Sequence, residues 1–241
     1  MTLRDCVAEF IGKPPGLVRV IMIHLRCATE RQSLIRELAS AIGGDLEIQD
    51  AVDGAQRIAE GHPTECGIHP GLQRTAGEIG CAESHLAAYQ AALADGVSHL
   101  VVFEDDCIPA PGFKVDAVRN YLRRAGHFAT EFSLQGMDDF LLLSTCGCYS
   151  WRHLTRGVKV TDHFNGSHAY IIGRKTMQKV LDFYEQLAAK KQTAPIDGVL
   201  PILLREERQW AFCPENDSEL FLQNRTIPSY VASDGSSPRL D

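Results

Sequence analysis

Short apolar runs alternate with longer amphipathic segments along this chain, a pattern typical of α/β proteins. Most of the runs are rich in β-branched residues and apolar throughout, which indicates strands buried on both faces of a mostly parallel sheet. The expected strands lie at residues 18–25, 46–52, 100–103, 140–144 and 169–172. The segments with apolar residues at helical spacing lie at residues 29–42, 77–94, 115–122 and 177–187.

The first strand, helix and strand predict a right-handed βαβ unit. Thr29 is the expected N-cap of the helix in this unit, and Gly43-Gly44 is its expected end. Residues 55–76 contain Gly, Pro and His without a clear period, so we expect an irregular surface excursion there. Residues 199–204 form a further apolar segment after a Pro-containing loop.

The length and composition predict one main domain. The chain has 241 residues, 44% hydrophobic and 23% charged, which is sufficient for one sizeable core. We expect residues 1–17 to be an N-terminal extension, residues 18–230 to be the domain, and residues 231–241 to be a flexible tail. We expect this domain to have two halves, one at residues of about 18–110 and the other at residues of about 111–230.

Charge and cysteine content narrow the range of partners. A net charge of −7 without a basic stripe argues against a nucleic-acid partner. No apolar run approaches the roughly 18 residues of a membrane span, and the polar residues near the start interrupt any secretory signal. The eight cysteines show no CxxC pair. We therefore expect a cytoplasmic protein with reduced, mostly buried thiols.

The strongest candidate chemistry lies in the triplet Glu104, Asp105 and Asp106, which directly follows the strand at 100–103. Side chains alternate along an extended chain, so Glu104 and Asp106 should share one side and Asp105 should face the other. Ligands of open α/β sheets bind at this end of the strands, and paired carboxylates there suit a hard divalent cation. A solvated acidic loop that closes the strand is the alternative.

Two further positions carry titratable groups near expected element ends. His85 falls in the opening half of the helix at 77–94, where a structural hydrogen-bonding histidine is the commoner case. Asp197 precedes the apolar segment at 199–204, where it could act as a base or as a helix N-cap. The residues themselves leave both choices open.

Several motifs in this order resemble glycosyltransferase family 25. The core of the resemblance is GEIGCAESH at residues 77–85 followed by LVVFEDD at 100–106. Further matches are VIMIHL at 20–25, AVDG at 51–54, FNGSHAYIIGRKTM at 164–177 and PID at 195–197. The resemblance covers roughly residues 18–230. It implies a GT-A fold, in which a Rossmann-like, mostly parallel sheet is flanked by helices.

The resemblance also implies roles for particular residues. Glu104 and Asp106 would bind Mn²⁺ or Mg²⁺, and Asp197 would be the catalytic base. The donor, a UDP-sugar, would contact His24, Arg31, Gly77, Glu78, Gly80, Ser84, His85 and Asp105. In this assignment Gly77, Glu78 and Gly80 form a close-approach turn around the donor, with Ser84 and His85 beneath it. His24 stands where family members typically carry Asn.

The function implied by the resemblance is an inverting transfer of a hexose to a hydroxyl of a glycan or lipid-linked glycan acceptor, with galactose as the leading candidate for the hexose. The protein would then act in surface polysaccharide or lipooligosaccharide synthesis, in peripheral association with the inner face of the membrane. A nucleotide-sugar-binding protein without turnover is an alternative. A haloacid-dehalogenase-like phosphatase is a weaker one, because its nucleophilic Asp would have to occupy position 104, which is Glu.

Overall fold

A computed structural model describes residues 1–131, 139–144, 148–155, 158–164, 166, 168–207, 209, 211–215 and 220–224, and for 148–155 and 162 only the backbone. Its larger sheet contains β1 (Val18–His24), β2 (Glu47–Asp50), β3 (His99–Glu104), β5 (Phe140–Leu142), β6 (Cys148–Thr155), β7 (Val158–Phe164), β8 (Ala169–Gly173) and β9 (Ala211–Pro214). A two-stranded sheet pairs β4 (Cys107–Pro109) with β10 (Phe221–Gln223). The helices are α1 (Leu3–Ile11), α2 (Gln32–Ala41), α3 (Gly54–Ala59), α4 (Ala76–Ala94), α5 (Val115–Glu131), α6 (Arg174–Ala189) and α7 (Ile196–Glu206).

The eight strands of the larger sheet follow the order β2-β1-β3-β8-β5-β9-β7-β6. Both neighbours of β1 run parallel to it, whereas β8 runs antiparallel to β3 and to β5. Continuing through β9, β7 and β6, six of the eight described strands point the same way, and only β7 and β8 oppose them. The α/β class and the mostly parallel sheet are thus confirmed.

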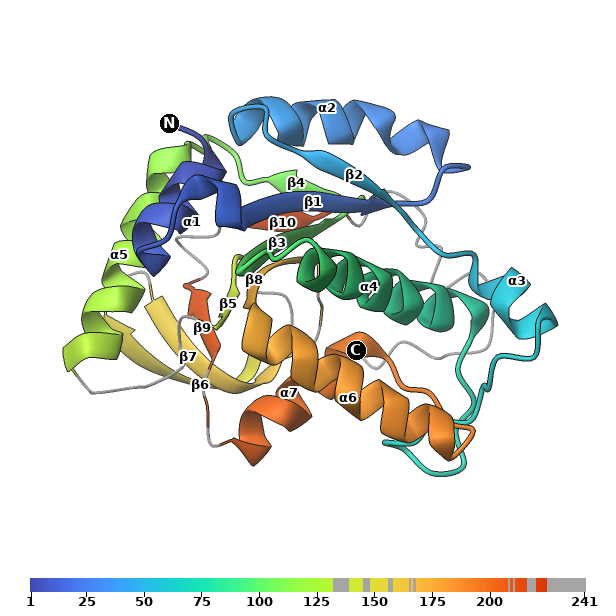
Figure 1. Cartoon of the computed structure of the whole chain (residues 1–241). Coiled ribbons are helices and arrows are strands. Elements are labelled where there is room, and N and C mark those ends of the chain that lie inside the picture. Colours follow the sequence, from blue (N-terminus) through green and yellow to red (C-terminus); the bar gives the residue numbers. More distant parts are fainter. Residues whose placement is uncertain are drawn as a thin grey trace.

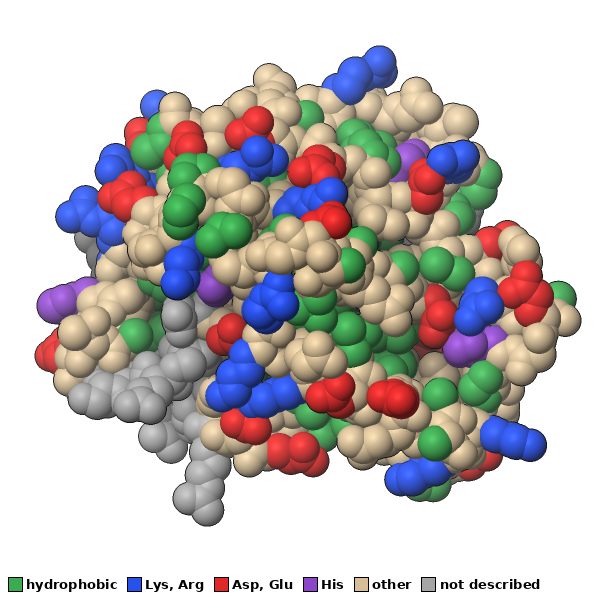
Figure 2. Space-filling model, viewed as in Figure 1, with side chains coloured by type: hydrophobic (Ala, Val, Ile, Leu, Met, Phe, Trp, Pro, Cys, Tyr) green, Lys and Arg blue, Asp and Glu red, His purple; other side chains and the backbone are tan. Residues whose placement is uncertain are grey.

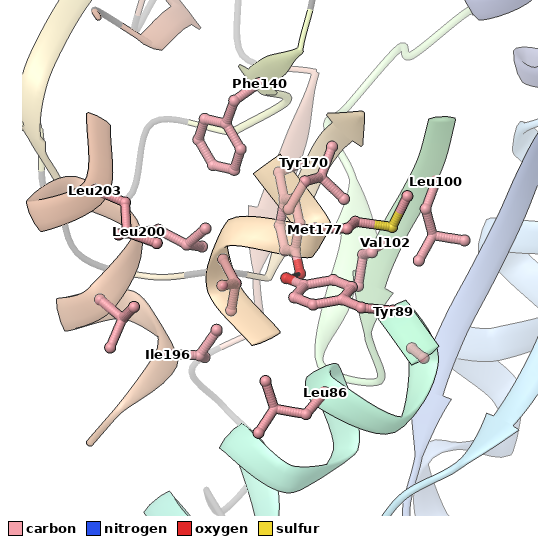
Figure 3. Packing of buried hydrophobic residues seen from close by; sticks show 14 of the residues in the cluster. Leu86, Tyr89, Leu100, Val102, Phe140, Tyr170, Met177, Ile196, Leu200 and Leu203 are labelled. Carbon is pink, nitrogen blue, oxygen red and sulfur yellow. Dashed lines mark hydrogen bonds between the residues drawn. The ribbon is translucent and has the colours of Figure 1, made fainter. Parts of the chain in front are cut away.

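Helices cover both faces of this sheet (Figure 1). On β3, Leu100 and Val102 pack with α4, α6 and α7, while Val101 and Phe103 pack with α1, α2 and α5. All four side chains are fully buried. Because successive side chains point to opposite faces, a strand covered on both sides needs an unbroken apolar run, which is what its sequence shows. Figure 3 shows the first of these two cores.

Residues 1–17, predicted as an extension, contain α1 and contribute to the second core. Thr2 and Asp5 form a capping box at the start of α1. Leu3, Cys6 and Val7 are buried in the core beneath it. In Figure 1 this helix lies beside α5 at the amino-terminal ends of the strands. The first residues therefore help to close one face of the sheet.

Several local predictions were wrong. Thr29 begins a short 3₁₀ turn, Thr29–Arg31, and α2 starts only at Gln32 without a side-chain cap. The stretch 55–76 is not wholly irregular, because Asp53 caps α3 there. The sequence pattern also gave no signal for β6, β7, β9 or β10. The predicted tail, 231–241, lies outside the described residues.

The face of the molecule shown in Figure 2 carries mixed charges. Lys and Arg side chains alternate with Asp and Glu over the face shown in Figure 2. No described helix combines the length and the apolar character needed to cross a membrane. The six cysteines whose side chains the structure describes are free thiols, and four of them are buried.

Candidate active site

A cavity of about 460 Å³ opens where β1 and β3 end and α4 and α7 begin. This size lies within the range of small-ligand sites. Ten of the eleven predicted site residues line it: Arg31, Gly77, Glu78, Gly80, Ser84, His85, Glu104, Asp105, Asp106 and Asp197. The eleventh, His24, is not among the lining residues, but it contacts Asp105, which is. Residues from distant parts of the chain thus meet at the carboxyl edge of the sheet, as expected for an open α/β fold.

The acidic triplet divides as the strand alternation predicts. Glu104 accepts a hydrogen bond from His85 and Asp106 accepts one from Gln223, whereas Asp105 turns to a separate set of partners. Asp105 and Asp106 are only 7% and 8% exposed. The alternative of a solvated acidic loop is therefore wrong, because two of the three carboxylates are buried in protein.

Asp106 is the carboxylate with spare bonding capacity. Its Oδ2 lies 3.0 Å from Nε2 of Gln223, but its Oδ1 is buried and has no hydrogen-bond partner among the described residues. Burial, and next the neighbouring charge of Glu104, raise the pKa of Asp106 from 3.8 to about 6. A buried carboxylate oxygen without a donor is costly, and a cation in the cavity would relieve that cost.

Asp105 is fully engaged by an ion-pair network at the end of β1. The Arg31 guanidinium binds its Oδ1, while Nδ1 of His24 lies 2.9 Å from Oδ2. The backbone N–H of Leu25 donates to the same Oδ2 at 3.3 Å. This network ties β1, the following 3₁₀ turn and β3 together. Asp105 therefore has structural partners, and since it also lines the cavity, its contact with the donor stays a prediction.

The predicted turn around the donor is a helix instead. Gly77, Glu78 and Gly80 lie in the first turns of α4, and Glu78 forms a capping box with Thr75. A Cβ at Gly80 would lie only 2.7 Å from the carbonyl oxygen of Val52. Glycine is therefore needed there because the backbone of the β2–α3 connection passes close to α4. The turn prediction was wrong, although all three residues reach the cavity.

Ser84 and His85 stabilise the wall of the cavity from within α4. Ser84 Oγ accepts a hydrogen bond from the Val52 backbone N–H at 2.8 Å and donates to the Gly80 carbonyl at 2.5 Å. His85 is fully buried, with Nδ1 2.6 Å from the Tyr170 hydroxyl and Nε2 3.3 Å from Oε1 of Glu104. His85 therefore links the core to the acidic end of the cavity.

Gln223, Tyr170 and Cys81 are among the residues of the site that sequence reasoning missed. Gln223 lies 117 positions from its partner Asp106, and Tyr170 lies 85 positions from His85, so no local pattern could connect them. Cys81 precedes His85 by four residues on one helix face, which is a readable signal. Potential ligand atoms of Cys81, His85 and Glu104 lie within 4.8 Å of one another. Burial raises the pKa of the Cys81 thiol.

Asp197 is the second residue of α7, in the first turn, and Pro195 occupies the N-cap position. The helix-cap alternative is thus wrong. Burial, and next the charge of Glu104, raise the pKa of Asp197, while backbone hydrogen bonds from Gly166 and from Asp197 itself act in the opposite direction. A half-buried carboxylate with a raised pKa, in a cavity that Glu104 and Asp106 also line, is a candidate proton acceptor.

The fold and cavity together define an α/β protein with a candidate ligand site at the carboxyl edge of its sheet. The sequence profile described as "Glycosyltransferase family 25 (LPS biosynthesis protein)" matches residues 18–200. The chain belongs to glycosyltransferase family 25. The matched region includes β1 and β3, the acidic triplet, α4 and Asp197.

Two relatives and one solved structure show the extent of similarity. A "Glycosyltransferase 25 family member" of Drosophila melanogaster is 32% identical over 124 residues, which are 47% of this chain and 20% of that protein. The lacto-N-neotetraose biosynthesis glycosyltransferase LgtB of Neisseria meningitidis is 27% identical over 187 residues, 75% of this chain and 64% of LgtB. The chain thus spans about a fifth of one relative and two thirds of the other. A mannose-1-phosphate geranyltransferase structure from Thermus thermophilus aligns with a TM-score of 0.39 at 12% identity, over 82% of this chain and 73% of that one.

Proposed function

We propose that this protein is a metal-dependent, inverting glycosyltransferase with a GT-A fold. It would transfer a hexose from a UDP-sugar to a hydroxyl group of a glycan acceptor, and galactose is the leading candidate for this hexose. The observation that carries the proposal is the unpartnered, buried Oδ1 of Asp106, on a residue that lines one cavity with Glu104 and Asp197. Membership of the family supports the reaction type.

The donor set fits a hard divalent cation. Glu104 and Asp106 offer carboxylate oxygens at the end of a rigid strand, and Mn²⁺ and Mg²⁺ prefer such ligands. Burial first, and then the neighbouring charge of Glu104, raise the pKa of Asp106, and the charge of Arg31 offsets this only in part. When bound, the cation would neutralise negative charge that grows on the diphosphate leaving group.

The surrounding side chains would bind and orient the donor. Arg31 brings a cationic guanidinium to the cavity wall, and Asp105 fixes its position. The amino terminus of α4 also reaches the wall through Gly77 and Glu78, and helix amino termini favour anions. His24 would act through Asp105, which it contacts, and not by touching the donor itself.

Asp197 is the proposed base. Proton removal from an acceptor hydroxyl is fastest when the base has a pKa close to the working pH, and burial moves the pKa of Asp197 in that direction. A single base that activates the acceptor opposite the departing diphosphate produces inversion at the anomeric carbon. Its place at the start of α7 holds the carboxylate on a rigid element.

The proposed acceptor is a glycan or lipid-linked glycan of surface polysaccharide or lipooligosaccharide. The family description refers to LPS biosynthesis, and LgtB is named for lacto-N-neotetraose biosynthesis. An acceptor of this kind would place the protein in the cytoplasm, in peripheral contact with the inner face of the membrane.

The test is a turnover screen with UDP-galactose, UDP-glucose and UDP-N-acetylglucosamine against lacto-series and lipooligosaccharide-derived acceptors. Each mixture is assayed with Mn²⁺, with Mg²⁺ and with EDTA, and products are identified by mass spectrometry and anomeric NMR. We expect a hexose adduct of inverted configuration that requires metal. Phosphate release without an adduct would indicate the phosphatase alternative, and UDP binding without an adduct would indicate a binding protein.

A further inference from the structure

A chain of buried polar side chains runs from the core to the acidic end of the cavity. The hydroxyls of Tyr89 and Tyr170 are hydrogen-bonded to each other. The Tyr170 hydroxyl lies 2.6 Å from Nδ1 of His85, and Nε2 of His85 lies 3.3 Å from Oε1 of Glu104. Figure 3 shows the hydroxyl oxygens of the two tyrosines turned toward one another within the apolar core. Tyr89, Tyr170 and His85 are each 0% exposed.

Rigid elements hold every member of this chain. Tyr89 and His85 lie one turn apart on α4. Tyr170 lies in β8, paired with Val102 of the strand that ends at Glu104. The rings of His85 and Tyr170 stack, with centroids 5.8 Å apart and an angle of 23° between their planes. The contacts therefore link α4, β8 and β3 at the point where the cavity begins.

Hydrogen bonds in such a chain can run in one of two directions, and only one satisfies all the donors. If Nδ1 of His85 donated to Tyr170, the Tyr170 hydroxyl would donate to Tyr89. The Tyr89 hydroxyl would then be a buried donor without an acceptor, since Tyr170 is its partner among the described residues. Leaving a buried donor unsatisfied is costly.

In the opposite direction every donor is used. Tyr89 donates to Tyr170, Tyr170 donates to Nδ1 of His85, and Nε2–H of His85 donates to Glu104. Burial raises the pKa of both tyrosines, so both hydroxyls keep their protons and remain donors. A chain of this kind also gains from mutual polarisation of its members.

We propose that Tyr170, supported by Tyr89, holds His85 as the neutral Nε2–H tautomer and is thereby a positioning residue for the carboxylate of Glu104. The tautomer follows from the hydrogen bonds alone. The positioning role rests on the proposed function, in which Glu104 binds the cation.

The same tautomer determines which cation the cavity accepts. By distance alone, Cys81, His85 and Glu104 could bind a soft ion such as Zn²⁺, which prefers sulfur and imidazole ligands. A ring nitrogen that carries a hydrogen has no lone pair for a metal. The chain therefore removes His85 from that set and leaves the oxygen ligands Glu104 and Asp106, which favour Mn²⁺ or Mg²⁺.

The first test is ¹⁵N NMR of the histidine rings in metal-free protein at pH 7. The protein contains nine histidines, and the His85 signals are assigned by their loss in His85→Gln. We expect the neutral Nε2–H tautomer. An Nδ1–H tautomer or an imidazolium would overturn the proposal, and neither result depends on whether the protein transfers sugar.

The second test compares three tyrosine variants. Tyr170→Phe should make the His85 tautomer mixed and weaken Mn²⁺ binding in the presence of UDP by roughly tenfold or more, the usual effect of removing such an outer partner. It should also allow Co²⁺ to bind with a cysteine-to-cobalt absorption band. Tyr89→Phe keeps the Tyr170–His85 bond and should keep the tautomer. Tyr184→Phe is the matched control, because its buried hydroxyl bonds the Ala194 carbonyl instead.

The two tests separate the tautomer of His85 from the positioning role of Tyr170. Unchanged tautomer and Mn²⁺ affinity in Tyr170→Phe would overturn the positioning role, as would equal losses in Tyr184→Phe. If Tyr170→Phe does not fold, the ¹⁵N signals of wild type and Tyr89→Phe still decide the tautomer. A confirmed tautomer in a protein that neither binds Mn²⁺ nor transfers sugar would refute the proposed function and leave the hydrogen-bond assignment standing.

Discussion

Replacement of Asp106 by Asn should stabilise the metal-free protein while abolishing its response to metal. The pKa of Asp106 is raised from 3.8 to about 6, chiefly by burial and by Glu104. A shift of this size corresponds to about 3 kcal/mol of preference for the uncharged carboxyl in the folded state. Asn keeps the shape and its amide oxygen can still accept from Gln223, but it cannot ionise.

The sign follows from proton binding. Between pH 4 and 6 the folded protein holds a proton on Asp106 that the unfolded chain has lost, so stability falls as the pH rises through this window. Above the raised pKa of Asp106, the stability that this proton contributes is completely lost. We therefore expect Asp106→Asn to be more stable than wild type by up to about 3 kcal/mol at pH 7 in EDTA, and the difference to vanish below pH 4.

The assay is urea unfolding of both proteins across pH, repeated with Mn²⁺ and UDP. Mn²⁺ should stabilise wild type and leave Asp106→Asn unchanged, because a ligand that binds only the folded state shifts its stability. Asp50→Asn is the control of opposite sign, since a hydrogen bond from Arg26 lowers the pKa of that exposed carboxylate. An Asp106→Asn protein less stable than wild type at pH 7 in EDTA would refute the reasoning.

Three further substitutions test other parts of the site. Asp197→Asn should lower transfer by roughly 10²-fold or more with near-normal UDP affinity by calorimetry; wild-type transfer would remove it as the base. His85→Ala should lower the free energy of unfolding by roughly 2 kcal/mol or more, because a buried ring and two hydrogen bonds are lost; an unchanged urea midpoint would contradict its structural role. Gly80→Ala should destabilise by roughly 1–3 kcal/mol and weaken UDP binding, since the new Cβ meets the Val52 carbonyl. Gly16→Ala, with no atom within 4 Å, is its neutral control, and equal stability of the two variants would refute the close contact.

The sequence by itself determined the α/β class and the place of the site. Residues 100–103 are apolar without a break because both faces of β3 are covered by helices, and this local pattern was readable. The acidic triplet directly after it could be assigned to the carboxyl edge of the sheet for the same reason. Alternation along the strand also correctly separated Asp105 from Glu104 and Asp106.

Only the tertiary structure decided what these residues contact. Asp106 contacts Gln223 and His85 contacts Tyr170, although the residues of each pair are more than eighty positions apart in the sequence. Such pairs depend on how distant strands and helices pack. Gly80 is required by a backbone that crosses from another element, and the turn that the family resemblance implied at this position is a helix. Periodicity reports which face of an element is buried, whereas partners, hydrogen-bond direction and pKa shifts depend on what covers that face, and local sequence does not contain that information.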